Sequence, residues 1–344
     1  MTDDGQAADP GGAPLPARRL GRSPVFVTEY SFGGAPIGNL FAAVTEDDAR
    51  ATVDAAWDGG IRTFDTAPHY GLGLSERRLG DALRGRPRAE YVISTKVGRL
   101  LWPASPPYGL DPEGFAVPAD HTREFDYSAD GVRRSLDASL ARLGLDRVDI
   151  ALIHDPDDHG DQALREAYPA LEKLRAEGVV GAIGVGMNQT AMLTRFVTET
   201  DIDVVLVAGR YTLLDSAAAD ALLPAALERG ISVIAGGVFN SGLLAAPLPS
   251  ATYDYQPAPG SLIDRARQLE RVCARFGVPL RAAAARFPLT HPAVASVLIG
   301  ARSVAELTDA LSLRARALPA ALGDALADSG VPWPSMERGG ATWL

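Results

Sequence analysis

The sequence predicts a single-domain α/β fold, a closed (β/α)8 TIM barrel with long loops at the C-terminal mouth. Eight short segments rich in Val, Ile and Leu alternate with amphipathic helical segments, which is typical of parallel strands covered on both faces. No Gly-x-Gly-x-x-Gly follows the first strand, because the Gly-Leu-Gly run at 71–73 meets Glu76 where a third glycine would be needed. An open doubly wound sheet is therefore the less favoured alternative.

The N-terminal half has clear helix boundaries between its strands. Thr45 is expected to cap a helix that stops at a Gly-Gly pair, and Ser128 to cap one that stops at Gly144. The segment 98–127 is rich in Pro, Gly and aromatic residues and is expected to be an irregular lid or binding loop. The strands expected here are 19–27, 28–34, 61–64, 91–97 and 148–154, and the helices are 45–57, 75–83 and 128–143.

The C-terminal half repeats the alternation with a second long loop at 238–259. Apolar runs end at Gly-containing turns, and Ser303 is expected to cap the last helix. The expected strands are 180–185, 204–208, 231–235 and 296–299, and the expected helices are 161–177, one from 190, 216–228, 261–276, 280–289 and 303–316.

The composition indicates a protein with ample core, since 47% of its 344 residues are hydrophobic and 22% are charged. The formal net charge of −10 argues against nucleic acid and anionic membrane as main partners. Cys273 is the single cysteine, which excludes an intrachain disulfide and fits a reducing cytoplasm. All apolar stretches are shorter than a membrane span. We expect a cytoplasmic protein that acts on a small molecule; the sequence leaves open whether it forms a homo-oligomer.

The two ends of the chain differ in composition from the rest. Residues 1–17 contain mainly Asp, Gly, Ala and Pro and lack the cationic start and apolar run of a signal peptide, so a disordered tail is expected. One barrel domain is expected over 18–330, followed by a C-terminal tail at 331–344.

Four polar residues fall at or just after the ends of neighbouring strands, where the loops of a barrel meet at one mouth. They are Asp65, Tyr70, Lys96 and His154. A lysine within an apolar strand is costly unless paired, and Asp65 is its obvious counter-ion. The ammonium would favour the phenolate of Tyr70 and lower its pKa, so that Tyr70 could exchange a proton with a substrate oxygen that His154 orients.

Each of these residues also has an ordinary structural explanation. Asp65 alone is as readily the cap of a turn, and Tyr70 alone a packed side chain with a hydrated hydroxyl. A single histidine at a strand end is more often a satisfied polar residue than a catalyst. The four together favour a proton-transfer site.

The motifs around these residues resemble the aldo-keto reductase family. They are Phe-Asp-Thr-Ala-Pro-His-Tyr-Gly at 64–71, Ser-Glu-Arg-Arg-Leu-Gly at 75–80, Ser-Thr-Lys-Val-Gly at 94–98, Leu-Ala-Arg-Leu-Gly at 140–144 and Gly-Ala-Arg-Ser at 300–303. The resemblance implies a barrel that binds a nicotinamide cofactor without a Rossmann domain. It also implies that Tyr70 is the acid/base, that Lys96 and Asp65 tune it, and that His154 orients the carbonyl.

The same resemblance implies a set of cofactor-binding residues, with departures from the family pattern. Asn188 is kept after the fifth strand, while the usual serine is absent, Ala208 stands in place of a glutamine, and Gly236 in place of a stacking aromatic. Phe239 is the substitute aromatic, and 238–244 resembles the loop over the pyrophosphate. The implied set is Gly34, Asp65, Asn188, Phe239, Asn240, Ser241, Gly242, Leu244, Gly300, Ala301, Arg302 and Glu306.

The phosphate end of this set bears on whether the cofactor is NAD or NADP. Arg302 could pair with a 2′-phosphate, whereas Glu306 stands where NADP-preferring members often carry Arg or Gln. A carboxylate there would repel a phosphate and could accept hydrogen bonds from ribose hydroxyls. The sequence slightly favours NAD.

Within the family, the motifs are most similar to the branch that oxidises L-fucose, D-threo-aldoses, L-galactose or pyridoxal at a hemiacetal carbon to a lactone. In that direction Tyr70 would act as base. A general aldehyde or ketone reductase using NADPH is the alternative. His69, Trp102 and Arg210 are the expected substrate-contacting residues, and none of them matches the family residue by residue.

Two functions from other classes are alternatives. The run His-Asp-Pro-Asp-Asp-His at 154–159 has metal-ligand residue types and would suit a metal-dependent barrel hydrolase, but it lacks ligands at other strand ends apart from His69, and no metal is expected. A non-catalytic cofactor-binding barrel is disfavoured by the intact set of four polar residues.

Overall fold

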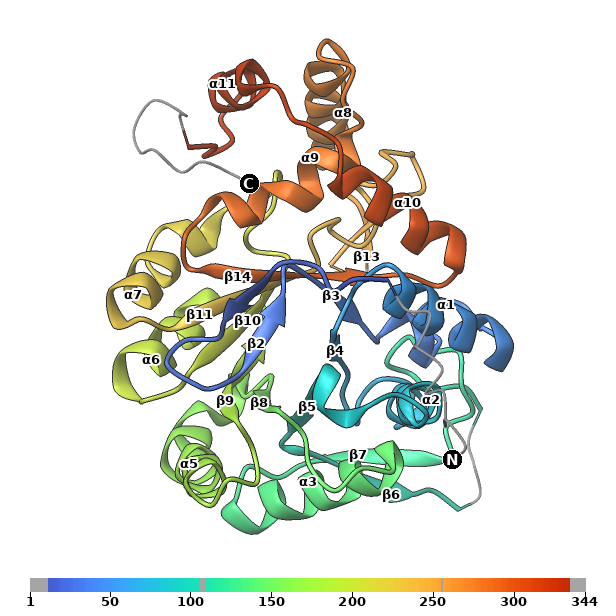
Figure 1. Cartoon of the computed structure of the whole chain (residues 1–344), viewed down its shortest axis with the longest axis vertical. Coiled ribbons are helices and arrows are strands. Elements are labelled where there is room, and N and C mark those ends of the chain that lie inside the picture. The colour runs from blue at the N-terminus through green and yellow to red at the C-terminus, as the bar shows by residue number, and fades with distance from the viewer. Residues whose placement is uncertain (1–11, 106–108, 255, 335–344) are drawn as a thin grey trace, which may run out of the picture.

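A computed structural model describes residues 12–105, 109–254 and 256–334. Eight parallel strands close into a barrel in the order β3-β4-β5-β8-β9-β10-β11-β14, with β14 returning to β3 (Figure 1). The predicted (β/α)8 barrel is confirmed. Its strands are β3 (Tyr30–Gly33), β4 (Thr63–Asp65), β5 (Val92–Val97), β8 (Ile150–His154), β9 (Ala182–Met187), β10 (Val204–Ala208), β11 (Ser232–Gly236) and β14 (Val294–Gly300).

Helices surround the barrel, and the N-caps expected at Thr45, Ser128 and Ser303 form. The Thr45 side chain accepts a hydrogen bond from the Asp48 N–H, Ser128 accepts one from Gly131, and Gly144 ends its helix in the left-handed conformation. The helices are α1 (Glu46–Asp58), α2 (Leu74–Leu83), α3 (Ala129–Leu143), α4 (Gly160–Gln162), α5 (Tyr168–Ala176), α6 (Thr190–Glu199), α7 (Leu222–Arg229), α8 (Gly260–Ala274), α9 (Leu280–Arg286), α10 (Val304–Arg314) and α11 (Ala320–Asp328).

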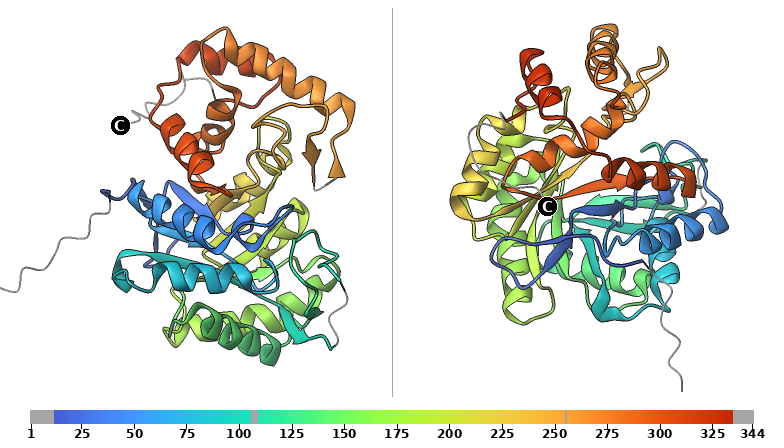
Figure 2. Two further views of the ribbon diagram at one scale, coloured as in Figure 1. Left: turned by 90° about the vertical axis from the view of Figure 1, so that its right-hand side faces the viewer. Right: turned by 45° about the horizontal axis from the view of Figure 1, so that its top comes forward.

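Some helical boundaries differ from the prediction. The helix expected at 161–177 is α4 and α5 joined by a π-helical turn at Ala163–Ala167, and the one expected at 280–289 ends earlier and continues as a 3-10 turn at Phe287–Thr290. The helix α11 was not expected. Figure 2 shows α8 and α11 projecting from the barrel on the side of α9 and α10.

The irregular segment expected at 98–127 contains an antiparallel hairpin, so that part of the prediction is wrong. Its strands are β6 (Arg99–Pro103) and β7 (His121–Phe125). Every residue of β7 is exposed or half-buried, and therefore this strand has no apolar alternation that the sequence could reveal. A second short hairpin, β12 (Thr252–Tyr253) with β13 (Gln256–Pro257), lies in the loop 238–259.

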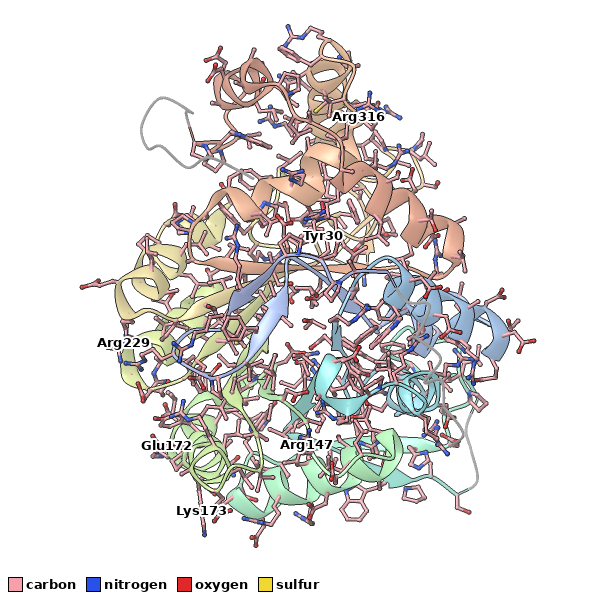
Figure 3. The ribbon with its side chains drawn as sticks, viewed as in Figure 1. Tyr30, Arg147, Glu172, Lys173, Arg229 and Arg316 are labelled. Carbon is pink, nitrogen blue, oxygen red and sulfur yellow. The ribbon has the colours of Figure 1, made fainter. Side chains whose placement is uncertain are left out.

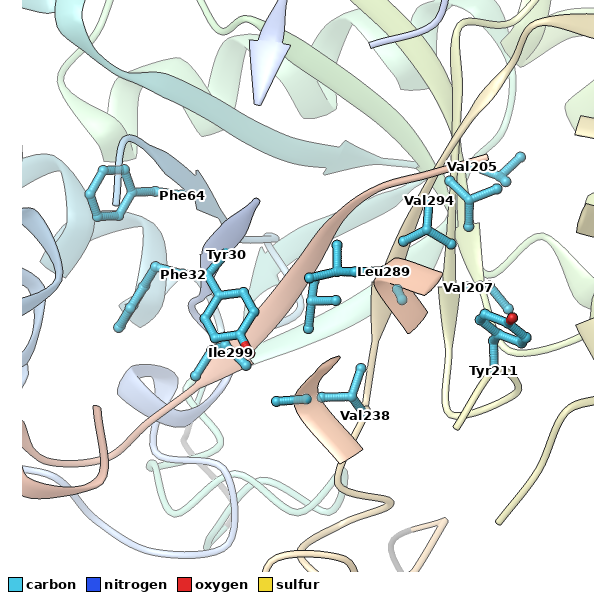
Figure 4. Packing of buried hydrophobic residues seen from close by; sticks show 14 of the residues in the cluster. Tyr30, Phe32, Phe64, Val205, Val207, Tyr211, Val238, Leu289, Val294 and Ile299 are labelled. Carbon is cyan, nitrogen blue, oxygen red and sulfur yellow. The ribbon is translucent and has the colours of Figure 1, made fainter. Parts of the chain in front are cut away.

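Strand side chains that point into the barrel fill its amino end. Leu152 and Leu206 belong to one buried cluster with Leu20 and Val27, which come from the hairpin of β1 (Ala17–Arg19) and β2 (Phe26–Thr28). Outward-facing residues pack against the helices, and the Phe32 and Phe64 rings lie 6.0 Å apart there (Figure 4). The amino end of the barrel is therefore closed by apolar side chains, which leaves the carboxyl end for the site.

Both ends of the described chain contact the barrel. The Leu15 N–H donates to the Gly60 carbonyl, and at the other end the Trp333 ring lies 5.6 Å from that of Phe287. Packing thus extends on both sides beyond the expected domain at 18–330. The remainder of the two expected tails, residues 1–11 and 335–344, lies outside the described residues.

Charged side chains cover the outer face of the helices. Glu172 and Lys173 on α5 and Arg229 on α7 point away from the barrel (Figure 3). None of the helices in the described ranges combines the length and apolarity that crossing a membrane requires.

Candidate active site

A buried ion pair forms the base of the site. Lys96, near the end of β5, places its Nζ 2.7 Å from Oδ2 of Asp65, the last residue of β4. The ammonium also donates to the Thr66 carbonyl at 2.9 Å, and the Ser94 hydroxyl donates to Asp65 Oδ1 at 2.9 Å. Burial alone would lower the pKa of Lys96, but Asp65 and Tyr70 outweigh it and raise that pKa, so Lys96 stays charged.

Tyr70 lies over this pair on the loop between β4 and α2. Its ring centroid is 4.7 Å from Lys96 Nζ, and the side chain is half-buried. The three residues that follow all have positive φ, and a Cβ at Gly71 would lie 2.2 Å from the Gly38 carbonyl oxygen. Glycine is therefore required at position 71 for the tight turn that presents Tyr70 to the mouth.

His154 ends β8 beside Tyr70. Its ring centroid is 6.0 Å from that of Tyr70, at an interplanar angle of 89°. The buried Tyr127 hydroxyl donates to the carbonyl of His154 at 2.6 Å, which holds the strand end in place. Burial, followed by the nearby positive charges of Arg99 and Lys96, lowers the pKa of His154 well below its usual value. The imidazole is consequently neutral.

His69 joins the same group. Its ring centroid lies 5.7 Å from that of His154 and 6.0 Å from that of Tyr70. Burial, with Arg99 and Arg123 adding positive charge, lowers the pKa of His69 to about 2. The structure thus places two neutral imidazoles beside the phenol ring.

A pocket of about 680 Å³ runs from Tyr70 and Asp65 to the N-terminal turns of α10. Its walls contain most of the residues predicted to hold a cofactor, namely Gly34, Asp65, Asn188, Phe239, Asn240, Ser241, Gly242, Gly300, Arg302 and Glu306. Leu244 and Ala301 are buried in the core and do not line this pocket. Ala208 and Gly236, which depart from the family pattern, form part of its wall.

The predicted substrate residues differ in where they lie relative to the pocket. Trp102 on β6 is 44% exposed and does not line the pocket. The Arg210 guanidinium pairs with both carboxylate oxygens of Asp254, at 3.0 and 2.6 Å, and so ties the hairpin β12–β13 to the end of β10. Asp254 lines the pocket, whereas Arg210 does not.

Two arginine–carboxylate pairs stand at the far end of the pocket. Arg302 Nη2 lies 3.1 Å from Glu306 Oε1, and the Arg302 backbone N–H donates to Glu306 Oε2 at 2.9 Å. Arg281 on α9 forms a two-pronged pair with Asp309 on α10 at 2.6 and 3.0 Å. Sequence reasoning missed this second pair, because an arginine and an aspartate on surface helices carry no distinguishing signal.

The pocket has the chemistry of a site for an extended polar cofactor. Oδ1 of Asn240 is buried and has no hydrogen-bond partner within the described residues, although its Nδ2 donates to the Gly209 carbonyl. An orphaned acceptor on a pocket wall is satisfied when a ligand donates to it. Small residues form much of the remaining wall, among them Gly33, Gly34, Ala208 and Gly236.

The run 154–159 does not converge on a single point. Asp155 pairs with Arg99, and the His159 ring lies 5.3 Å from that of Tyr127. Across the described residues, no group of three or more His, Cys, Asp or Glu side chains is arranged to hold a metal ion.

The family model of the Aldo/keto reductase family matches residues 30–324. The chain belongs to this family. It is therefore an oxidoreductase acting on alcohol and aldehyde groups, and the family match decides against the metal-dependent hydrolase. Enzymes of this family use NAD(P)H and act on small molecules.

Similar curated proteins share most of the length of this chain. A D-threo-aldose 1-dehydrogenase from Pseudomonas sp is 49% identical over 88% of this chain and 94% of its own. A pyridoxal 4-dehydrogenase from Microbacterium luteolum is 43% identical over 83% of this chain and 89% of its own. An L-galactose dehydrogenase from Arabidopsis thaliana is 35% identical over 85% of this chain and 86% of its own.

Solved structures support the fold. The holo form of an aldo-keto reductase from Bacillus halodurans superposes with a TM-score of 0.71 at 25% identity, covering 94% of this chain and 99% of that one. This reductase shares the barrel of the present chain.

Proposed function

We propose that this aldo-keto reductase is an NAD-dependent dehydrogenase that oxidises an aldose of the L-fucose or D-threo type at its hemiacetal carbon to a lactone. The observation that carries the proposal is the stack of Tyr70 over the buried Lys96–Asp65 pair, with neutral His154 beside it. The 49% identity to a D-threo-aldose 1-dehydrogenase over nearly the full length supports the substrate class.

Tyr70 is the residue that exchanges a proton with the substrate. The Lys96 ammonium stabilises the phenolate, and Asp65 keeps the ammonium charged in its buried position. The phenolate then accepts the proton of the hemiacetal hydroxyl, while the carbon that carries this hydroxyl gives up its hydride. In the reverse direction the phenol returns this proton to the carbonyl oxygen.

His154 orients the reacting oxygen. A neutral imidazole donates one hydrogen bond and adds no charge, whereas an imidazolium would compete with Lys96 for the phenolate. The carbonyl oxygen that develops during oxidation accepts this bond. The buried position of His154 excludes water from that side of the oxygen.

The nicotinamide cofactor, when bound, supplies the acceptor for the hydride. We assign its binding to the pocket residues near Tyr70, with Asn188 and the buried Oδ1 of Asn240 as polar partners. Phe239 and its neighbours on the 238–244 loop would cover the bound cofactor, and Arg302 with Glu306 would contact its far end.

The proposed preference for NAD is supported by the pairing of the two arginines at that end. Glu306 and Asp309 neutralise Arg302 and Arg281, so neither guanidinium offers an uncompensated charge to a 2′-phosphate. Glu306 can accept hydrogen bonds from ribose hydroxyls.

Pyridoxal is the second candidate substrate. The 43% identity to a pyridoxal 4-dehydrogenase favours it, and its hemiacetal would present the same reacting carbon to Tyr70. A general reductase using NADPH is the alternative in the opposite direction, and the paired arginines argue against it.

The test is turnover by the purified chain with L-fucose, L-galactose, D-arabinose and pyridoxal, each with NAD and with NADP. We expect NADH formation with at least one aldose, at a higher kcat/KM than with pyridoxal. Binding of either cofactor is followed separately by nicotinamide fluorescence. Turnover of pyridoxal alone would replace the aldose assignment, and absence of cofactor binding would refute the whole proposal.

A further inference from the structure

Arg99 connects the two histidines of the site. This buried arginine, at the start of β6, brings Nη1 to 3.2 Å from Nδ1 of His69. Its Nη2 pairs with Asp155, whose Oδ2 lies 3.5 Å from Nε2 of His154. One guanidinium thus holds His69 directly and reaches His154 through a carboxylate.

The contact with Arg99 fixes the tautomer of His69. A guanidinium has only donor N–H groups, so Nδ1 of His69 must be the acceptor and the proton of the neutral ring must sit on Nε2. The low pKa of His69 keeps the ring in this neutral state. His69 therefore presents an Nε2–H donor.

Further contacts fix the position of the His69 ring. Arg123 donates from Nη2 to the His69 carbonyl at 3.0 Å and makes a two-pronged pair with the buried Asp111. The Phe115 ring stands edge-on to the imidazole with centroids 5.1 Å apart. Such support from several directions is what a preorganised binding group requires.

The Nε2–H of His69 has no acceptor in the described parts of the chain, although the His69, Tyr70 and His154 rings form a triangle with centroids 5.7 to 6.0 Å apart. An unused donor beside a proton-transfer site is satisfied when substrate supplies an oxygen. We propose that His69 donates a hydrogen bond to a hydroxyl oxygen of the substrate other than the reacting one, and that Arg99 is the positioning residue that holds His69 in this tautomer. The proposal rests on the proposed oxidation of a polyhydroxy substrate.

Arg99 has a second consequence for selectivity. Burial first, and then the charge of Arg99 that Asp155 partly balances, disfavour protonation of either imidazole, so the site offers two neutral donors. Neutral donors suit the hydroxyl groups of a sugar, and they give a carboxylate substrate no counter-charge. The substrate class is therefore an uncharged compound with at least two neighbouring oxygens.

The first experiment compares two substitutions of His69. Gln can place an amide N–H near the position of Nε2, whereas Leu fills similar space without a donor. With the best aldose substrate, His69→Leu is expected to lower kcat/KM about tenfold or more, and His69→Gln to recover much of that loss. With the analogue that lacks the hydroxyl next to the reacting carbon, the difference between Leu and Gln should vanish. An equal loss for both variants on both substrates would overturn the donor role.

The second experiment reads the tautomer directly and needs no substrate. Long-range nitrogen–proton NMR of the ring nitrogens, assigned with His69→Gln, should show His69 as the Nε2–H form in the wild-type chain. Arg99→Met should convert it to a mixture of tautomers, and the matched control Arg195→Met on the outer helix α6 should leave it unchanged. A wild-type ring protonated on Nδ1, or one that Arg99→Met does not alter, would refute the positioning role.

The two experiments separate this inference from the proposed function. If no aldose is oxidised, the proposed function fails, and with it the role of His69 toward a polyhydroxy substrate. The NMR result would then still decide whether Arg99 sets the tautomer.

Discussion

Lys96 and Asp65 form a pair that is sealed from solvent beneath the Tyr70 ring, with Nζ and Oδ2 2.7 Å apart and side chains 2% and 4% exposed. Two opposite charges buried in this way stabilise each other only while both are present. The pair therefore has two separable effects, one on the folding free energy and one on the proton affinity of Tyr70.

Tyr70→Phe should lower kcat by several orders of magnitude, because the phenol oxygen is the only group that we assign to proton transfer. The ring remains, so packing over Lys96 and cofactor affinity should change little. Steady-state kinetics and nicotinamide fluorescence titration measure the two quantities. A variant that keeps more than a tenth of the wild-type kcat would remove Tyr70 from the acid/base role.

Asp65→Asn should destabilise the fold, since it leaves the buried ammonium of Lys96 without a counter-charge. Removal of one partner from a buried pair costs about 3–5 kcal/mol in known cases, whereas replacing both with uncharged residues is often neutral. The double variant Asp65→Asn, Lys96→Met should therefore regain much of the stability while remaining inactive. Urea unfolding of the single and double variants provides the measurement, and additive losses in the double variant would contradict it.

Acid should destabilise the protein through its buried histidines. Burial lowers the pKa of His69 to about 2 and that of His154 well below the usual value near 6.5, so below that pH the unfolded chain binds protons that the folded chain excludes. The free energy of unfolding should then fall as the pH drops, by up to about 1.4 kcal/mol per pH unit for each histidine. Asp155 has the opposite effect at lower pH. Its pKa is raised in the folded chain, so its protonation increases the free energy of unfolding as the pH falls.

The control for this pH effect is His69→Gln, which removes one titrating group. The slope of unfolding free energy against pH, measured by urea unfolding between about pH 6.5 and 5, should be shallower in this variant than in the wild-type chain. Identical slopes would show that His69 is protonated to the same extent in the folded and the unfolded chain.

The sequence predicted the barrel. It also predicted that Asp65, Lys96 and His154 lie at one site, because polar residues at the ends of apolar strands are conspicuous. The sequence did not indicate the roles of Arg99 and Arg281, since arginines are common both in loop-like segments and on outer helices. Their roles depend on neighbours far along the chain, such as His69 and Asp309, and those distances exist only after folding. The hairpin β6–β7 was missed for a related reason: its solvent-exposed strand lacks an apolar face.

Glu306 should control the choice between the two cofactors. Glu306→Gln removes the charge that neutralises Arg302 while keeping the side chain near its present size. A freed guanidinium attracts a 2′-phosphate, so NADP affinity should rise about tenfold while NAD affinity falls modestly. Glu306→Arg should extend the shift further toward NADP.

The matched control for Glu306 is the double variant Glu306→Gln, Arg302→Met, which lacks both charges of the pair. If Arg302 binds the phosphate in Glu306→Gln, the double variant should lose the gain in NADP affinity, and raised salt should weaken that gain in the single variant. Fluorescence titration of both cofactors at low and high salt measures these changes. An NAD/NADP affinity ratio that stays the same in Glu306→Gln and Glu306→Arg would show that discrimination resides elsewhere in the pocket.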